Sequence, residues 1–72
     1  MMTKKEALIK LAESEGLSEE ELFAQATFDS IAPGICLACG YTTTVEPDQD
    51  KGYCEVCRAN TVQSCLVLAN II

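Results

Sequence analysis

The sequence predicts a small α+β domain in which helices come first and strands follow. Three observations support this prediction: two helix-start signals with helical apolar spacing before residue 29, alternating β-branched residues after residue 35, and two close pairs of cysteines in that second part. Because the chain has 72 residues, we expect one domain over 1–72, with a helical hairpin at 3–28 and a strand-rich part at 35–72. A core this small provides only about 3–5 kcal/mol, so the fold requires an additional constraint.

The first predicted helix begins with a capping box. Thr3 and Glu6 have the spacing at which each side chain satisfies a backbone N–H group left free at a helix start. Gly16 is expected to end the helix, since glycine takes the left-handed conformation without a steric penalty. One arc of this helix is apolar and is expected to face the core: Ala7, Leu8, Leu11 and Ala12.

The second predicted helix starts at about Glu19, directly after the first. Ser18 and Glu21 form a second capping box, and Leu17 and Leu22 occupy the positions of a hydrophobic staple. The side of this helix that faces the core is expected to carry Leu22, Phe23 and Ala26.

The stretch "TFDSIAPG" is expected to end this helix. Pro33 disfavours helical geometry in the residue before it, and Gly34 indicates a turn. Phe28 and Ile31 are expected to fold back and join the two halves of the chain.

Two stretches after this turn predict β-strands. "YTTTVE" alternates, so that Tyr41, Thr43 and Val45 share one side, as in an antiparallel strand. "PDQDKG" has the composition of a turn. The apolar stretch "TVQSCLVLANII" is expected to contain the third strand.

Four cysteines predict a metal site. They form two CxxC pairs, Cys36 with Cys39 and Cys54 with Cys57, separated by 14 residues. The CxxC spacing lets two sulfurs point at one ion, and the intervening loop brings the second pair over to complete a tetrahedron. A redox pair normally opens a helix in a βαβ unit, and structural disulfides belong to exported proteins, so both alternatives are weaker. Such a site accepts zinc or iron; we expect zinc and keep iron as the alternative.

Three residues near these pairs carry further expectations. Gly40 directly follows the first pair and fits the tight backbone of such a turn. After the second pair, Asn60 is expected to take the left-handed conformation. Cys65, the fifth cysteine, is expected to be a small buried hydrophobic residue.

From Ile35 to about Ile72 the chain resembles a zinc ribbon, in which two CxxC knuckles lie at the tips of β-hairpins in a small three-stranded antiparallel sheet. The stretch "CLACGY" also resembles the first knuckle of rubredoxins, which hold iron, but rubredoxins place far more residues between the two pairs. The whole chain resembles small uncharacterised zinc-ribbon proteins of bacteria and their phages, a resemblance that implies no particular activity. The ribbon resemblance implies these ligands for one Zn²⁺: Cys36, Cys39, Cys54 and Cys57.

The charge of the chain bears on its partners. Eleven acidic and five basic residues give a net charge of -6, which repels nucleic-acid phosphates and anionic membranes. The expected partner is therefore a protein. The stretch "LAESEGLSEEEL" resembles a helix-turn-helix, with Ala12, Gly16 and Leu22 at the spacing of that family. In that family the second helix enters the major groove, whereas here its first turn is acidic, so a nucleic-acid-associated ribbon is kept as an alternative.

The expected function is that of a structural zinc protein which presents an acidic surface to a protein partner; an iron electron carrier resembling rubredoxin is an alternative. Four sulfur ligands leave no open position and the chain has no histidine, so we expect no enzyme. An apolar export signal is absent and "CLVLANII" is too short to span a bilayer, so we expect a cytoplasmic protein without membrane contact. The apolar end "LVLANII" exceeds what a small sheet buries, which leaves three partners open: the sheet, the helices, or a second copy in a homodimer.

Overall fold

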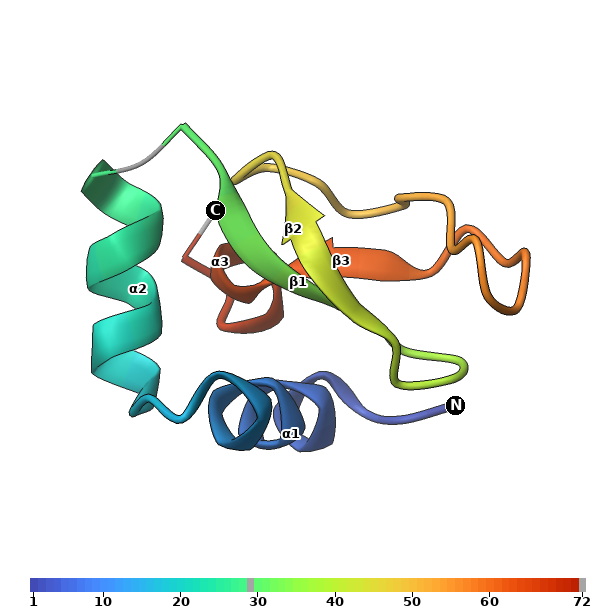
Figure 1. The fold of residues 1–72 in the computed structure, drawn as a ribbon, viewed down its shortest axis with the longest axis horizontal. Helices are drawn as coiled ribbons and strands as arrows, with labels where there is room; N and C mark the ends of the chain where they lie inside the picture. Colours follow the sequence, from blue (N-terminus) through green and yellow to red (C-terminus); the bar gives the residue numbers. More distant parts are fainter. Residues whose placement is uncertain (29, 72) are drawn as a thin grey trace.

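The computed structural model describes residues 1–28 and 30–71 and places two helices ahead of a three-stranded sheet (Figure 1). The three strands are antiparallel in the order β2-β1-β3, which confirms the expected α+β architecture of two helices followed by an antiparallel sheet. Figure 1 shows α3 between the sheet and the two longer helices, with α1 below it and α2 at the left. The elements are α1 (Lys4–Glu15), α2 (Glu19–Phe28), β1 (Ala32–Cys36), β2 (Thr42–Val45), β3 (Val62–Ser64) and α3 (Cys65–Leu68).

Both predicted capping boxes are present. The Thr3 hydroxyl accepts a hydrogen bond from the Glu6 N–H, and the Glu6 carboxylate accepts one from the Thr3 N–H, each at 3.1 Å. Ser18 and Glu21 make the same reciprocal pair at the start of α2, at 3.3 and 3.1 Å. Gly16 ends α1 with φ of 68°, as expected. Local hydrogen bonding therefore sets the corner between the two helices, because Gly16 caps the end of α1 and Ser18 caps the start of α2.

The main core lies between the helices and the inner side of the sheet. The predicted apolar arc of α1 is buried, and so are Leu22 and Ala26 of α2, while Phe23 packs half-buried at the edge of the core. Ile31, expected to join the two halves, is instead 52% exposed, and the side chain of Phe28 lies outside the described residues. The fully buried members of this core are Ala7, Leu11, Leu22, Ala32, Ile35 and Cys65.

Strand β1 passes through the segment expected to be a turn. Its ladder to β2 starts where the Cys36 N–H donates to the Tyr41 carbonyl at 2.8 Å. Since bonded and non-bonded pairs alternate along antiparallel strands, Pro33 falls at a position whose nitrogen points away from β2. The pairing with β3 starts only at Gly34, so the missing N–H of Pro33 leaves no gap in the sheet.

At position 34 the neighbouring strands approach so closely that only glycine, which has no side chain, fits in β1. A Cβ atom there would lie 2.7 Å from Cγ2 of Val45 on β2 and 3.1 Å from the carbonyl oxygen of Gln63 on β3. Gly34 therefore marks a close approach of three strands, and the prediction of a turn at this residue was wrong.

Strand β3 is shorter than expected because Ser64 starts a helix. The Ser64 hydroxyl accepts a hydrogen bond from the Val67 N–H at 3.2 Å, which caps α3. The outer edge of β3 is covered by the segment 49–52, where Gly52 and Val62 exchange two backbone hydrogen bonds at 2.9 and 3.0 Å. The outer edge of β2 is the free edge of the sheet within the described residues.

The stretch "TVQSCLVLANII" contains the third strand, β3, as expected, and its apolar residues after Ser64 form a buried helix. Asn70, with φ of 60°, ends α3, and its N–H donates to Val67 while the Ile71 N–H donates to Leu66. All four residues of α3 are buried against α1, α2 and β1, whereas Asn70 and Ile71 beyond them are exposed. A short apolar run fits a buried strand or a buried helix equally well, and here the capping residues decide between them. Helix α3 thus forms part of the protein's own core.

None of the helices in the described segments 1–28 and 30–71 combines the length and the apolar character needed to cross a membrane.

Candidate metal centre

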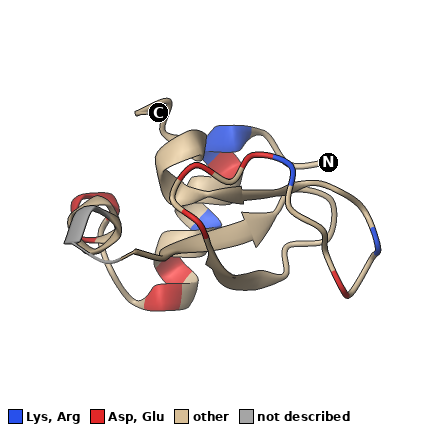
Figure 2. Cartoon of the chain, turned by 90° about the horizontal axis from the view of Figure 1, so that it is seen from above, with Lys and Arg blue, Asp and Glu red and all other residues tan. Residues whose placement is uncertain are grey.

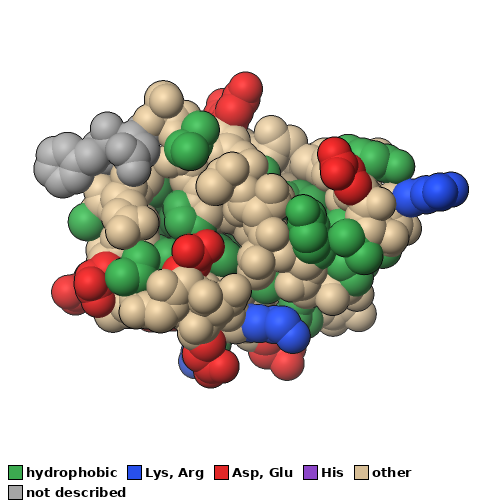
Figure 3. All heavy atoms as spheres, viewed as in Figure 1, with side chains coloured by type: hydrophobic (Ala, Val, Ile, Leu, Met, Phe, Trp, Pro, Cys, Tyr) green, Lys and Arg blue, Asp and Glu red, His purple; other side chains and the backbone are tan. Residues whose placement is uncertain are grey.

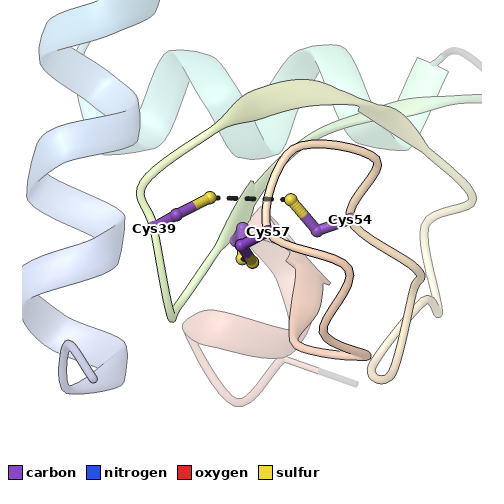
Figure 4. A group of neighbouring side chains, drawn as sticks. Cys39, Cys54 and Cys57 are labelled. Atoms are coloured by element: carbon purple, nitrogen blue, oxygen red, sulfur yellow. Dashed lines mark hydrogen bonds between the residues drawn. The ribbon is translucent and has the colours of Figure 1, made fainter.

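The four predicted cysteines converge at one end of the sheet. Their Sγ atoms all lie within 4.8 Å of one another. The Sγ atoms of Cys39 and Cys54 are 3.5 Å apart, and so are those of Cys36 and Cys57. Figure 4 shows the sulfurs of Cys39 and Cys54 facing each other across the dashed line, with the Cys57 side chain just below it. A tetrahedral ion with metal–sulfur bonds of about 2.3 Å requires sulfurs about 3.8 Å apart, so this cluster has the dimensions of a four-sulfur site.

The first pair is held by a tight turn at the end of β1, the first knuckle (residues 36–41). The Gly40 N–H donates to the Cys36 carbonyl at 2.8 Å, and the Cys36 N–H donates to the Tyr41 carbonyl, also at 2.8 Å. Gly40 has φ of 82°, as its position directly after the pair predicted. Cys36 is buried and Cys39 is exposed, so the cluster lies at the surface with one side supported by the sheet.

The second pair repeats this geometry in the second knuckle (residues 54–59). The Arg58 N–H donates to the Cys54 carbonyl, and the Cys54 N–H donates to the Ala59 carbonyl, both at 2.8 Å. The left-handed residue is Arg58, with φ of 63°, and the prediction of Asn60 was wrong. Arg58 directly follows its pair just as Gly40 follows the first, so the turn geometry, and not asparagine's preference, decides which residue is left-handed.

Backbone N–H groups surround the sulfurs in the same pattern in both knuckles. The first sulfur of each pair accepts from the two N–H groups that lie two and three residues later, and the second sulfur accepts from the N–H two residues later. Such donors stabilise thiolates, which are the form that binds metal. The donors are Ala38 and Cys39 to Cys36, Tyr41 to Cys39, Val56 and Cys57 to Cys54, and Ala59 to Cys57.

The thiols of the cluster have opposed proton affinities. Burial raises the pKa of Cys36, but hydrogen bonds from the Thr61 hydroxyl and from backbone N–H groups outweigh it and lower this pKa to about 6. The Tyr41 N–H lowers the pKa of Cys39, yet burial and the facing sulfurs raise it to about 12. Four sulfurs this close do not all ionise unless a cation lies between them. The donor set therefore fits a divalent metal ion.

Two contacts to this cluster had no signal in the sequence. The Thr61 hydroxyl lies 3.1 Å from the Cys36 Sγ, although it comes 25 residues later in the chain. The side chain of Lys10, on α1, lies against the first knuckle, since a Cβ on Gly40 would be 3.1 Å from the lysine Cε. Both contacts depend on tertiary packing, and no local spacing indicates them.

Cys65 lies apart from the four-cysteine cluster. It is fully buried in the helix-side core, with its Sγ 3.9 Å from the carbonyl oxygen of Leu22, as expected of a small hydrophobic residue. Burial raises the pKa of its thiol, which keeps it protonated. Cys36 and Cys54 instead pack with Val62 in a second small core beneath the metal centre.

The fold and the cluster define a small α+β protein with a four-cysteine centre suited to a metal ion. Comparison of the chain with protein-family models, curated proteins and solved structures finds no match.

The left-handed residue of the second knuckle provides a test of this geometry. We expect Arg58→Gly to stabilise the protein by about 0.5–1 kcal/mol, because relief of the left-handed conformation outweighs the greater freedom of glycine in the unfolded chain. Thermal unfolding with metal present measures the change. Arg58→Ala is the control, since it removes the same charge and keeps the strain; equal melting temperatures for the two variants would contradict the prediction.

Proposed function

We propose that this chain is a structural zinc protein of the zinc-ribbon class, with one Zn²⁺ held by the four clustered cysteines. The observation that carries the proposal is the convergence of four sulfurs from two knuckles of matching backbone geometry. Four thiolates fill a tetrahedral zinc site, and six backbone N–H groups support them. Zinc is the usual structural ion for such a donor set, and iron is the alternative that the same sulfurs accept.

The proposed role of the ion is to hold the fold, without catalysis. A closed four-sulfur site offers no position for water or substrate, and the chain contains no histidine to act as a base. Four thiolates contribute -4 and Zn²⁺ contributes +2, which moves the formal charge from -6 to -8. The loaded protein is therefore poorly suited to bind nucleic acid.

We further propose that the folded protein acts as an interaction module for another protein. The apolar tail no longer supports this role, because α3 is buried in the protein's own core. What supports it is a set of large hydrophobic side chains that remain at the surface, among them Ile9 at 45% exposure, Tyr53 at 60% and Val56 at 63%. Figure 3 shows such side chains gathered over the right-hand end of the molecule, where the orange segment runs in Figure 1.

Metal analysis of protein purified without added metal tests the zinc assignment. We expect about one zinc per chain and a colourless solution, because Zn²⁺ has a filled d shell. Cys54→Ser with Cys57→Ser is expected to abolish metal binding, whereas Cys65→Ser, the matched control, is expected to retain it. A coloured protein with one iron per chain would replace zinc by the electron-carrier alternative. A salt-dependent shift of a labelled duplex would instead favour the nucleic-acid alternative.

A further inference from the structure

An open groove lies at the corner where α1 meets α2. None of the residues that line it is a cysteine of the metal centre. Its volume is about 540 Å³. The floor is apolar and consists of Ile9 and Ala12 from α1 and Leu17 from the corner. Gly16 borders this floor, and nothing lies within 4 Å of the place where its Cβ would be. The missing side chain thus keeps the corner open.

The groove leaves a hydrophobic surface unpaired within the fold. Ile9 is 45% exposed, and Leu17, which packs against the main core, is only half-buried. Ile9 and Glu13 lie one helical turn apart on the same face of α1, so the apolar floor and the acidic end of the groove follow each other along this helix. This floor accommodates one aliphatic or aromatic side chain of a partner.

The rim of the groove is acidic at one end. Glu13 and Glu19 line it, and both side chains are exposed. In the first turn of α2, the Glu21 carboxylate is hydrogen-bonded in the capping box with Ser18. Glu19, in the same turn, lines the groove. Figure 2 shows acidic residues on α2 and on the adjoining part of α1, and the sequence has no Lys or Arg between residues 11 and 50.

The other end of the groove carries a cation. Lys5 lies eight residues before Glu13 on α1, which corresponds to about 12 Å along the helix axis. The groove therefore has a direction: Lys5 at one end, the apolar floor in the middle, and Glu13 with Glu19 at the other end. A matching ligand is a peptide segment with one apolar residue and with positively charged residues on only one side of it.

We propose that this groove binds a short segment of another protein in which one apolar residue is followed by two or more Lys or Arg residues. The apolar side chain covers Ile9 and Leu17, and the cations pair with Glu13 and Glu19. Charge complementarity selects this occupant, since Glu13 and Glu19 lie together at one end of the groove and the whole chain has a net charge of -6. The inference rests on the proposed interaction role and names its site and its partner's chemistry.

The test uses zinc-loaded, full-length, isotope-labelled protein and three hexapeptides. The probe is Gly-Gly-Leu-Lys-Lys-Lys; in the first control Glu replaces each Lys, and in the second Ser replaces the Leu. Titration followed by amide chemical shifts at low salt is expected to give at least about tenfold tighter binding of the probe than of either control. Shift changes are expected at Ile9, Gly16 and Leu17.

Matched variants separate the groove from general charge effects. Ile9→Ser and the double variant Glu13→Gln with Glu19→Gln are each expected to weaken binding by about three- to tenfold. Their controls carry matching changes away from the groove and the metal centre: Ile31→Ser for the first, Glu46→Gln with Asp50→Asn for the second. Lys5→Gln is expected to tighten binding about twofold, because it removes a cation from the rim.

The outcomes distinguish the groove from the wider proposal. Equal binding of the probe and its Glu control, or equal loss in the groove variants and their controls, would overturn the groove as the site. Shift changes confined to Tyr53 and Val56, or to a contact with a second copy of the chain, would overturn it while leaving an interaction role. A folded chain without bound metal would contradict the structural zinc and still permit the peptide titration.

Discussion

Removal of the metal with a chelator is expected to unfold the sheet of this protein. Strand β3 has three residues and β2 has four, so the sheet by itself has few hydrogen bonds to hold it. Structural zinc sites contribute about 10–16 kcal/mol in zinc-finger peptides. A folded chain of 72 residues has a total stability of about 4–11 kcal/mol, so the contribution of the ion is as large as this total or larger.

Circular dichroism and thermal unfolding, with and without the chelator, measure this effect. Addition of Zn²⁺ in excess is expected to restore the spectrum, and addition of Mg²⁺ is not, because Mg²⁺ prefers oxygen ligands. The Cys65→Ser variant serves as a control for loss of a cysteine that does not belong to the cluster. If the metal-free chain kept its spectrum and its melting temperature, the structural role of the ion would be wrong.

Leu22→Ala is expected to cost about 2–5 kcal/mol of stability, the range for a leucine removed from a packed core. Leu22 is fully buried on α2, and its backbone carbonyl faces the Cys65 Sγ of α3. The cavity would therefore open where α2, α3 and β1 meet, and α3 is too short to close it by moving. Urea unfolding of the zinc-loaded variant measures the change.

Val56→Ala is the matched control for this variant. Val56 is 63% exposed in the second knuckle, and its truncation is expected to change stability by no more than about 0.5 kcal/mol. Metal content is expected to stay at one ion in both variants, because the cysteines pack on the separate core around Val62. Equal losses of stability in Leu22→Ala and Val56→Ala would contradict the position of the core.

The parts of the structure that depend on local chemistry were predictable from the sequence. Capping boxes at Thr3 and Ser18 are interactions between residues three apart, and their spacing is visible in the printed chain. The cysteine cluster was predictable for a similar reason, because CxxC spacing reflects the geometry of one turn around one ion. Gly40 followed from the same turn.

The parts that depend on tertiary contacts were not predictable. Gly34 lies in a strand because two neighbouring strands approach it, which no local pattern reveals. The third strand lies in "TVQSCLVLANII" as expected, but no local pattern reveals that Ser64 and Asn70 cap the residues between them as a helix inside the core. Thr61 and Lys10 reach the metal centre only through packing. The left-handed Arg58 was missed because residue preference was given more weight than the repeat of the first knuckle.

The unequal edges of the sheet limit how copies of this protein can assemble. In the part of the chain that the structure describes, the segment 49–52 covers the outer edge of β3, whereas the outer edge of β2, whose four residues are uncharged, has no strand beside it. A sheet that is open on both sides can add strands without end, as in a fibre. With one edge closed, two chains that meet through β2 leave no further edge to extend. A pair of chains joined through β2 would therefore form one closed sheet of six strands.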